Sequence, residues 1–401
     1  MTESAVSALP VLRLKRNEDK RLRAGHLWVF SNEVDNEAQA LTSFVPGGIA
    51  RVHNSRDQFV GYACVNPHAL ICARLLSRDE SLPIGPALFE RRLRSALSLR
   101  QRLYEHTSYR LVFGESDGLP GLVLDRYGDV VVGQIATLGM ELLRGELEAA
   151  IHAVVAPRVL VWKNDSSARD LEKLPRTVES TVPGMPSHVE VIEEGLHLQA
   201  PLLEGQKTGW FYDQAANREH LRRYLPRGAR VLDVCSYVGA WALTALRQGA
   251  ASAACVDASQ AALDWAQRNA AANGLELQTH KGDAFDVLAA LGEQGARFDV
   301  VIVDPPAFIK RKKDLPQGEA AYRRLNQLAM RLLSDDALLV SCSCSYHLPQ
   351  DALPAIVQAA ASHSGRTAQI LEFGGQSPDH PVHPAIPETR YLKTVFCRVT
   401  R

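Results

Sequence analysis

The sequence predicts a multidomain α/β protein with an N-terminal β-barrel, a small central α+β domain and a C-terminal doubly wound α/β domain. The chain has 401 residues, more than one ordinary core accommodates. Its first part reads as short apolar runs separated by turn residues, whereas strand and helix patterns alternate after Gln199. We therefore place the domains at residues 1–80, 84–190 and 195–401.

The N-terminal domain is predicted to be a barrel of short strands. Turn residues at 46–48 and 54–57 separate apolar runs, which is typical of small β-barrels. The expected strands cover residues 11–14, 28–30, 48–52, 59–63 and 71–75.

The central domain is predicted to combine helices with a short run of strands. Leucines and arginines alternate with helical spacing over 85–104, which predicts a helix there, and a second helix is expected over 141–155. The expected strands cover residues 109–113, 121–124, 130–135, 159–162 and 189–191.

The C-terminal domain is predicted as a sheet in which strands and helices alternate. The expected strands cover residues 230–234, 253–257, 276–280, 298–304, 337–341 and 391–399. The expected helices cover residues 240–248, 259–273, 285–291, 319–333 and 353–362. In such sheets ligands bind beyond the carboxyl ends of the strands.

The composition is that of a globular chain without membrane or secretion signals. Its residues are 46% hydrophobic and 22% charged, and no apolar run reaches the roughly 18 residues of a transmembrane helix. The first residues lack the basic and apolar segments of a signal peptide. Seven cysteines without framework spacing favour a reducing compartment. We therefore expect a cytoplasmic protein without a membrane partner.

Two basic clusters lie within a chain of zero formal net charge. The first spans Arg13 to Arg23, and the second is Lys310-Arg311-Lys312-Lys313, just after an Asp-Pro-Pro sequence. Most such clusters form solvated faces, although they also bind phosphate backbones. The second cluster is the stronger candidate because it adjoins a chemical motif.

Acidic residues end successive predicted strands of the C-terminal domain. Asp233 lies in the first strand, and Gly239 in the following turn allows a ligand to approach the backbone. The turn lacks the other glycines of a dinucleotide site, which disfavours pyrophosphate and a dehydrogenase. Asp257 is placed for ribose hydroxyls and Asp283 for an exocyclic amine. One such Asp is usually a helix cap, but all three together with Asp304 indicate S-adenosylmethionine, whose sulfonium is cationic.

Another predicted strand ends in Asp304-Pro305-Pro306-Ala307-Phe308. The prolines fix an extended path and donate no hydrogen bond, so their carbonyls and the Asp can face a substrate ring. Phe308 can stack on a base, or it can be a core aromatic. The motif alone fits methyl transfer to an amino nitrogen or to carbon.

Two cysteines, Cys342 and Cys344, follow a further apolar run. C5 of cytosine becomes nucleophilic when a thiolate adds to C6, and cysteine both adds and leaves readily. The run Leu339-Val340-Ser341-Cys342-Ser343-Cys344-Ser345 resembles the nucleophile motif of RNA cytosine-C5 methyltransferases. In that register Cys344 coincides with the nucleophile, and Cys342 is expected to be a small buried hydrophobe. No C-x-x-C pair supports a metal site, and none is expected.

Further segments resemble the bacterial large-subunit ribosomal RNA methyltransferase I family over essentially the whole chain. Segments 12–15 and 25–33 are similar to its N-terminal PUA domain, an RNA-binding barrel, and 114–122 to its central domain. The segment 205–218, with Gln206-Lys207-Thr208-Gly209, resembles the motif before its Rossmann-like class I methyltransferase sheet. Segments 379–384 and 388–393 resemble its closing motif.

The resemblance implies formation of 5-methylcytosine in 23S rRNA with S-adenosylmethionine as cofactor, and it is compatible with a homodimer. The predicted catalytic residues are Cys344 and Asp304. The predicted cofactor-binding residues are Phe211, Asp213, Arg218, Asp233, Ser236, Tyr237, Gly239, Asp257, Ala258, Asp283, Ala284 and Asp304. The predicted substrate-binding residues are Pro305, Pro306, Phe308, Lys310 and Lys207.

The chain departs from many RNA cytosine-C5 enzymes at Ala307, where those enzymes carry a second cysteine. The base that removes the C5 proton is therefore unassigned. Two alternatives stay open. One is an RNA amino-group methyltransferase that uses the Asp304 motif and structural cysteines. The other is a noncatalytic RNA-binding ribosome-assembly factor with a relict cofactor fold.

Overall fold

The computed structural model describes residues 9–401, so residues 1–8 of the expected barrel domain lie outside the described part. The chain forms two compact units, and neither is continuous in sequence. The first contains the residues up to Ser187 together with Leu202–Trp210 and Asp379–Thr389. The second contains His188–Pro201, Phe211–Pro378 and Arg390–Arg401. A separation of the first unit into two domains near residue 80 stays a prediction.

The N-terminal part of the first unit is a five-stranded sheet in the order β1-β3-β4-β5-β2. Alternate residues such as Leu12, Leu14 and Val52 are fully buried and form its core, which explains the regular apolar pattern. From residue 9 to the end of β5, the only helix of four or more residues is the short α2 (Lys20–Arg23). The strands are β1 (Val11–Arg13), β2 (Trp28–Phe30), β3 (Gly48–His53), β4 (Phe59–Val65) and β5 (Ile71–Ser77), close to the predicted positions.

A second sheet in the same unit has the order β10-β9-β8-β7-β6. Its strands are β6 (Ser108–Phe113), β7 (Leu122–Tyr127), β8 (Val130–Ile135), β9 (Val159–Asn164) and β10 (Thr177–Ser180). Its helices are α3 (Pro86–Leu103), α4 (Leu138–Leu142) and α5 (Arg144–Val155). The helix expected over 141–155 is confirmed as α5, although residues 141 and 142 belong to α4. Leu143, whose φ of −95° and ψ of 9° are not helical, separates the two helices.

The strand expected at 189–191 does not continue this central sheet. It lies in β11 (His188–Glu193), which pairs only with β12 (Leu196–Pro201) in an antiparallel hairpin of the second unit. Glu194 and Gly195 form its two-residue turn, and both have positive φ, as a type I′ hairpin turn requires. Asn269 and Asn273 of a nearby helix bind the β12 backbone, and these bonds fix the hairpin to the second unit.

The second unit is built on a seven-stranded sheet in the order β15-β14-β13-β16-β17-β19-β18. The first five strands in this order are parallel, and β19 is antiparallel to both of its neighbours. The strands are β13 (Arg230–Val234), β14 (Ser252–Asp257), β15 (Gln278–Lys281), β16 (Phe298–Val303), β17 (Leu333–Ser343), β18 (Thr367–Gly374) and β19 (Lys393–Thr400).

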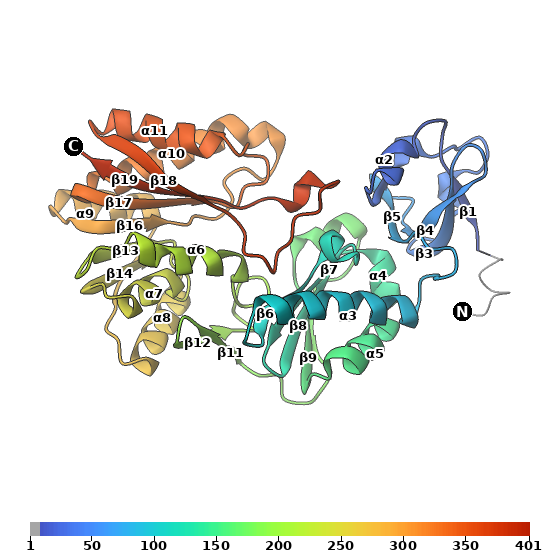
Figure 1. Ribbon diagram of the computed structural model, residues 1–401, viewed down its shortest axis with the longest axis horizontal. Coiled ribbons are helices and arrows are strands. Elements are labelled where there is room, and N and C mark those ends of the chain that lie inside the picture. Colours follow the sequence, from blue (N-terminus) through green and yellow to red (C-terminus); the bar gives the residue numbers. More distant parts are fainter. Residues whose placement is uncertain (1–8) are drawn as a thin grey trace. The chain divides into compact units, whose positions relative to one another are not determined.

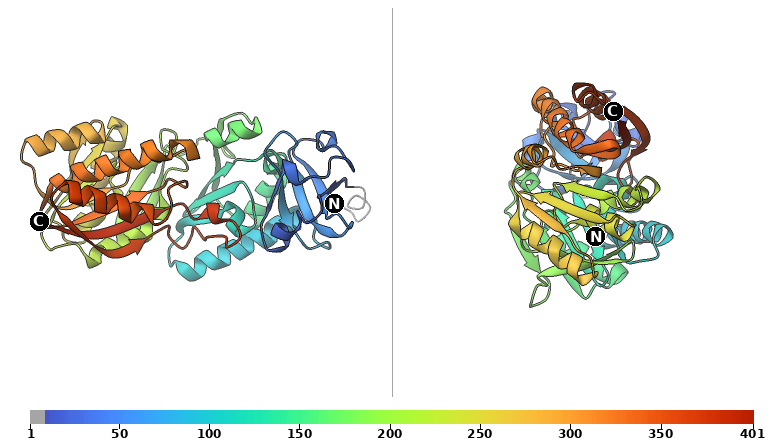
Figure 2. Two further views of the ribbon diagram at one scale, coloured as in Figure 1. Left: turned by 90° about the horizontal axis from the view of Figure 1, so that it is seen from above. Right: turned by 90° about the vertical axis from the view of Figure 1, so that its left-hand side faces the viewer.

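Helices cover both faces of this sheet, as Figure 1 shows. Successive residues of each strand point to opposite faces of the sheet. Leu232 and Val301 pack against one set of helices, and Val231 and Val300 pack against the other. Figure 2 shows α10 and α11 of the first set side by side. The first set is α9 (Ala284–Glu293), α10 (Leu315–Arg331) and α11 (Ala352–His363), and the second is α6 (Ala215–His220), α7 (Ala240–Arg247) and α8 (Gln260–Ala272).

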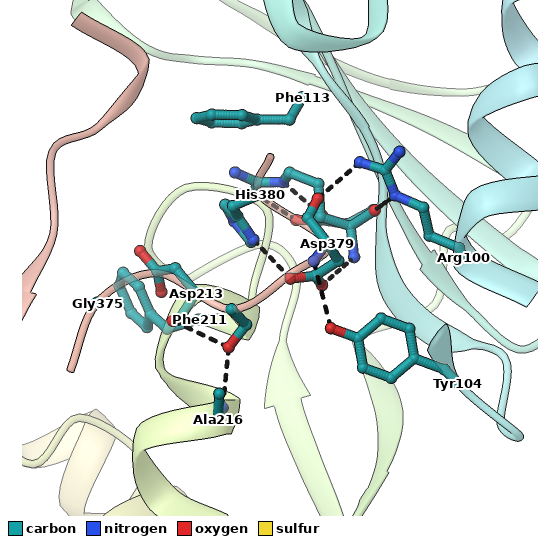
Figure 3. Close-up of polar contacts among 12 residues, drawn as sticks. Arg100, Tyr104, Phe113, Phe211, Asp213, Ala216, Gly375, Asp379 and His380 are labelled. Carbon is teal, nitrogen blue, oxygen red and sulfur yellow. Dashed lines mark hydrogen bonds and ion pairs between the residues drawn. The ribbon is translucent and has the colours of Figure 1, made fainter. Parts of the chain in front are cut away.

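The segment Asp379–Thr389 clusters with the first unit, and Asp379 holds it there. Its Oδ2 accepts from the backbone N–H of Arg110 at 2.8 Å, and its carbonyl accepts from the Arg100 guanidinium at 2.6 Å. Figure 3 shows Arg100, Tyr104 and the His380 ring around it. The contacts give the predicted closing motif a clear structural role.

Within residues 9–401, no helix is both long and apolar enough to cross a membrane. The described residues also contain no group of His, Cys, Asp and Glu side chains that could hold a metal ion. All seven cysteines are free thiols.

Candidate active site

The sheet of the second unit brings the Asp-Pro-Pro sequence and the cysteine run to the same edge. Val303 of β16 is paired with Ser341 of the parallel neighbour β17, so the residues after each strand emerge together. The Cys344 Sγ lies 3.9 Å from the carbonyl oxygen of Pro305. Cys342 is fully buried inside β17, and burial raises its pKa well above the usual value for a thiol. The two cysteines thus differ in environment, as expected from the sequence.

Hydrogen bonds fix the loop after β17 to the loop after β16. The Ser345 Oγ accepts from the backbone N–H of Ile309 at 3.1 Å and lies 2.8 Å from the Tyr322 hydroxyl. Tyr322 and Ser345 are both buried. Cys344 is therefore presented by a loop that is held on both sides.

Asp304 is held by two residues that the sequence did not single out. Gln214 Nε2 and Trp241 Nε1 both donate to its Oδ2, at 2.9 and 3.3 Å. Asn217 in turn donates to the Gln214 Oε1 at 2.7 Å. The sequence contained one indication that Gln214 belongs to the site, because Gln214 lies in the segment that resembles a family motif. It contained no such indication for Trp241 apart from its place after Gly239.

The environment of Asp304 raises its pKa to about 6. The main cause is burial, and the negative charge of Asp213 adds to it, while the bond from Trp241 and the charge of Arg218 oppose it. The group is still mostly ionised at neutral pH. It can therefore accept a hydrogen bond from an amino group at the substrate edge.

Asp233 is fully buried, and only one of its oxygens is satisfied by the protein. Its Oδ2 accepts from the backbone N–H of Ala242 at 3.2 Å, whereas Oδ1 has no hydrogen-bond partner among the described residues. Burial raises its pKa to about 8. A buried carboxylate oxygen without a partner is costly, which is typical of a group that meets a ligand.

The turn after β13, which follows Asp233 in the chain, has an unusual backbone conformation. Cys235, Tyr237 and Gly239 all have positive φ. At Gly239 a side chain would also place its Cβ 3.0 Å from that of Ala266, so only glycine fits without strain. Ser236, also predicted to bind the cofactor, is buried in this turn.

Asp257 and Asp283 end the next two strands, where the sequence places them. Asp257 accepts from the backbone N–H groups of Tyr237 and Ser259, each at 2.9 Å, so it links the first turn to the second. Asp283 is exposed and caps α9 through the N–H of Phe285. Ala258 and Ala284 follow these two carboxylates, the first exposed and the second half-buried.

The donor set fits S-adenosylmethionine. Acidic side chains at three neighbouring strand ends suit a ligand with hydroxyl, amino and sulfonium groups. The turn at Gly239 lets such a ligand come close to the protein backbone. The Phe211 ring meets Tyr237 edge-on at 5.4 Å beside this turn. A phosphate would face several acidic groups here, so a dinucleotide does not fit.

Two predicted cofactor residues, Asp213 and Arg218, are buried among protein partners. Arg218 forms a two-pronged ion pair with Glu193 of β11 and donates to the Phe211 carbonyl at 3.1 Å. Asp213 accepts from the Tyr391 hydroxyl. The Arg218 contacts position Phe211, so an effect of Arg218 on a cofactor is expected to be indirect.

The predicted substrate residues have three different environments. The Phe308 ring packs against Tyr322 at 4.8 Å and Phe285 at 6.2 Å, so it is largely a core aromatic. Pro305 is buried, whereas Pro306 and Lys310, which follow Asp304 in the sequence, are exposed. Lys207 is exposed but belongs to the first unit, so its role stays a prediction.

The two basic clusters also differ. In the N-terminal cluster Arg13, Arg21 and Arg23 are each paired with a carboxylate. In the second cluster only Arg311 has such a partner, and the exposed side chains of Lys310, Lys312 and Lys313 form no ion pair within residues 9–401. Lys15, Arg16 and Lys20 of the first cluster are likewise exposed and form no ion pair in the described part of the chain. Both clusters therefore leave three cations for a phosphate backbone, and only the second adjoins the Asp304 motif in the sequence.

We expect Asp233→Asn to stabilise the fold increasingly as pH rises. In the folded protein the pKa rises from 3.8 to about 8, so across this window the folded state keeps a proton that the unfolded state loses. Stability therefore falls with rising pH, and an uncharged Asn removes that loss. Denaturant unfolding at about pH 5 and about pH 8 measures the difference between the two proteins. An equal difference at both pH values would contradict this assignment.

Comparison with known proteins supports both the fold and the cofactor. Residues 12–78 match a PUA-like domain, and residues 174–397 match an S-adenosylmethionine-dependent methyltransferase family. S-adenosylmethionine is thus the cofactor of this chain, and the predicted fold class is confirmed. A solved SAM-dependent methyltransferase structure from Streptococcus mutans has a TM-score of 0.81 at 20% identity, covering 97% of this chain and 100% of its own. A similar one, with a TM-score of 0.82, is a complex with SAH.

Two curated relatives match the chain from end to end. Ribosomal RNA large subunit methyltransferase I of Salmonella arizonae is 35% identical over 407 residues, and that of Salmonella schwarzengrund is 36% identical over the same length. In each case the match covers 100% of both chains. The chain therefore belongs to the ribosomal RNA large subunit methyltransferase I family.

Proposed function

We propose that this protein methylates C5 of a cytosine in 23S rRNA, with Cys344 as covalent nucleophile. The observation that carries this proposal is the position of Cys344, whose Sγ lies 3.9 Å from the carbonyl of Pro305, directly after Asp304. An amino-group methyltransferase needs no thiol at that place. The names of the relatives support large-subunit rRNA as the substrate.

In this mechanism the Cys344 thiolate forms a bond to C6 of the cytosine. The electrons of the C5–C6 double bond then make C5 nucleophilic, while Asp304 accepts from the exocyclic amine and keeps the ring in place. S-adenosylmethionine, when bound, supplies the methyl group as an electrophile on its sulfonium. Transfer of the C5 proton to a base, which stays unassigned, then restores the double bond and breaks the S–C6 bond, which returns the thiolate.

The base has to leave its stack to reach Cys344, at a cost of a few kcal/mol. The unpaired lysines of the cluster at 310–313 can offset that cost through contacts with phosphates next to the target. Contacts by the N-terminal barrel are a further part of the proposal, because the match there is to a PUA-like domain.

The proposal is tested by incubating the protein with 23S rRNA and isotopically labelled S-adenosylmethionine, followed by mass spectrometry of the digested nucleosides. The label is expected in 5-methylcytidine. A label in an amino-methylated nucleoside would support the alternative that uses Asp304 with structural cysteines. Cofactor binding without any turnover on rRNA or ribosomal particles would favour the noncatalytic alternative.

A further inference from the structure

Lys393, the first residue of β19, is a buried lysine in the candidate site. Its side chain is only 3% exposed, and its Nζ donates to the carbonyl oxygens of Ser345 and Tyr391, at 2.6 and 2.8 Å. No carboxylate forms an ion pair with it in the part of the chain that the structure describes. Burying an ammonium without an anion is costly, so such a group usually serves a purpose.

The position of Lys393 ties it to Cys344. Lys393 is paired with Ser343 in the β17–β19 ladder, and its bond to the Ser345 carbonyl reaches the residue directly after Cys344. The lysine therefore contacts the cysteine loop on both sides of the sulfur-bearing residue.

Two charged groups act on Lys393. Burial lowers its pKa to about 8, the negative charge of a Cys344 thiolate raises it, and the positive charge of Arg390 lowers it. Among residues 9–401, a Cys344 thiolate is therefore the charged neighbour that favours the ammonium form of Lys393. With this pKa the lysine is still mostly protonated at neutral pH, so an ammonium is present when the thiolate forms.

We propose that Lys393 is a positioning residue, whose ammonium group stabilises the Cys344 thiolate and whose hydrogen bond to Ser345 fixes the cysteine loop. The inference rests on the proposed function, in which Cys344 is the nucleophile. When the S–H bond breaks and its proton passes to solvent, the charge left on sulfur is balanced by the ammonium. That charge leaves sulfur when the S–C6 bond forms and returns when the bond breaks, so the ammonium favours ionisation of the thiol and its later release from C6.

The test is the rate at which iodoacetamide alkylates Cys344 in the full-length protein, followed by peptide mass spectrometry over a range of pH. Alkylation needs the thiolate but neither RNA nor cofactor. In Lys393→Met the rate at neutral pH is expected to fall about tenfold, the change that one pKa unit produces. The pH of half-maximal rate is expected to move upward, and Lys393→Arg, which keeps the charge, is expected to retain most of the rate.

Lys393→Gln separates charge from hydrogen bonding, because its amide can still donate to the Ser345 carbonyl. Cys344 in this variant is expected to be alkylated as slowly as in the Met variant. If the Met variant does not fold, the Gln variant is compared with the wild type instead. Lys281→Met, at an exposed position of β15, serves as a matched control without effect. Equal rates in the wild type and a folded Gln or Met variant would overturn the inference.

The outcome is distinguishable from failure of the proposed function. If Cys344→Ala retained methyl transfer, the covalent route would be wrong, yet the alkylation experiment would still report whether Lys393 stabilises the thiolate. If Cys344→Ala were inactive and the alkylation rates were equal, only the role of Lys393 would be wrong.

Discussion

Cys344→Ala is expected to abolish methyl transfer to 23S rRNA, with a loss of at least about a thousandfold. Without the sulfur nothing adds to C6, and C5 of the cytosine stays a weak nucleophile. The cofactor residues that we propose, among them Asp233 and Asp257, do not include Cys344, so S-adenosylmethionine affinity is expected to change little. Single-turnover methylation of 23S rRNA and calorimetric titration of the cofactor measure the two quantities separately.

Cys342→Ala is the matched control, because it removes the same atom two residues earlier. Cys342 is fully buried, and its Sγ accepts from the Thr394 hydroxyl at 3.4 Å. Its substitution is expected to lower the free energy of unfolding by about 1 kcal/mol and to leave methyl transfer nearly unchanged. Full activity of Cys344→Ala, or a comparable loss of activity in both variants, would rule out Cys344 as the nucleophile.

Asp304→Asn is expected to lower kcat by about a hundredfold to a thousandfold, with a smaller change in KM. The variant keeps the shape of the side chain and can still accept from Gln214 and Trp241. It loses the negative charge that, in the proposed mechanism, strengthens the hydrogen bond from the exocyclic amine and holds the ring in place. Steady-state kinetics on rRNA measure both constants.

The pH profile gives this prediction a second readout. The pKa of Asp304 is about 6, so wild-type activity is expected to fall as the pH drops through that value and the carboxylate is protonated. The Asn variant cannot be protonated there, and its residual activity is expected to lack this acid limb. An unchanged acid limb in Asp304→Asn would assign the titration to another group.

Much of the fold follows from local sequence patterns. The strand over 130–135 and the helix over 85–104 appear within a residue or two of their predicted ends, because their apolar residues repeat with a clear period. β18 was not predicted. It is one of the two edge strands of the sheet, and its side chains, including Phe373 at 69% exposure, bury too little for an apolar pattern to arise.

The sequence by itself determined the chemical groups at the site. The acidic strand ends, the Asp-Pro-Pro sequence and the cysteine run are contiguous motifs at the ends of strands, and parallel strands present their carboxyl ends at one edge. The tertiary structure alone decided what surrounds these groups. Gln214 and Trp241 donate hydrogen bonds to Asp304, and Lys393 donates one to the cysteine loop. In each case the two partners are far apart in the sequence. Burial and long-range hydrogen bonds set the pKa values and positions of the reacting groups, and both depend on how remote segments pack.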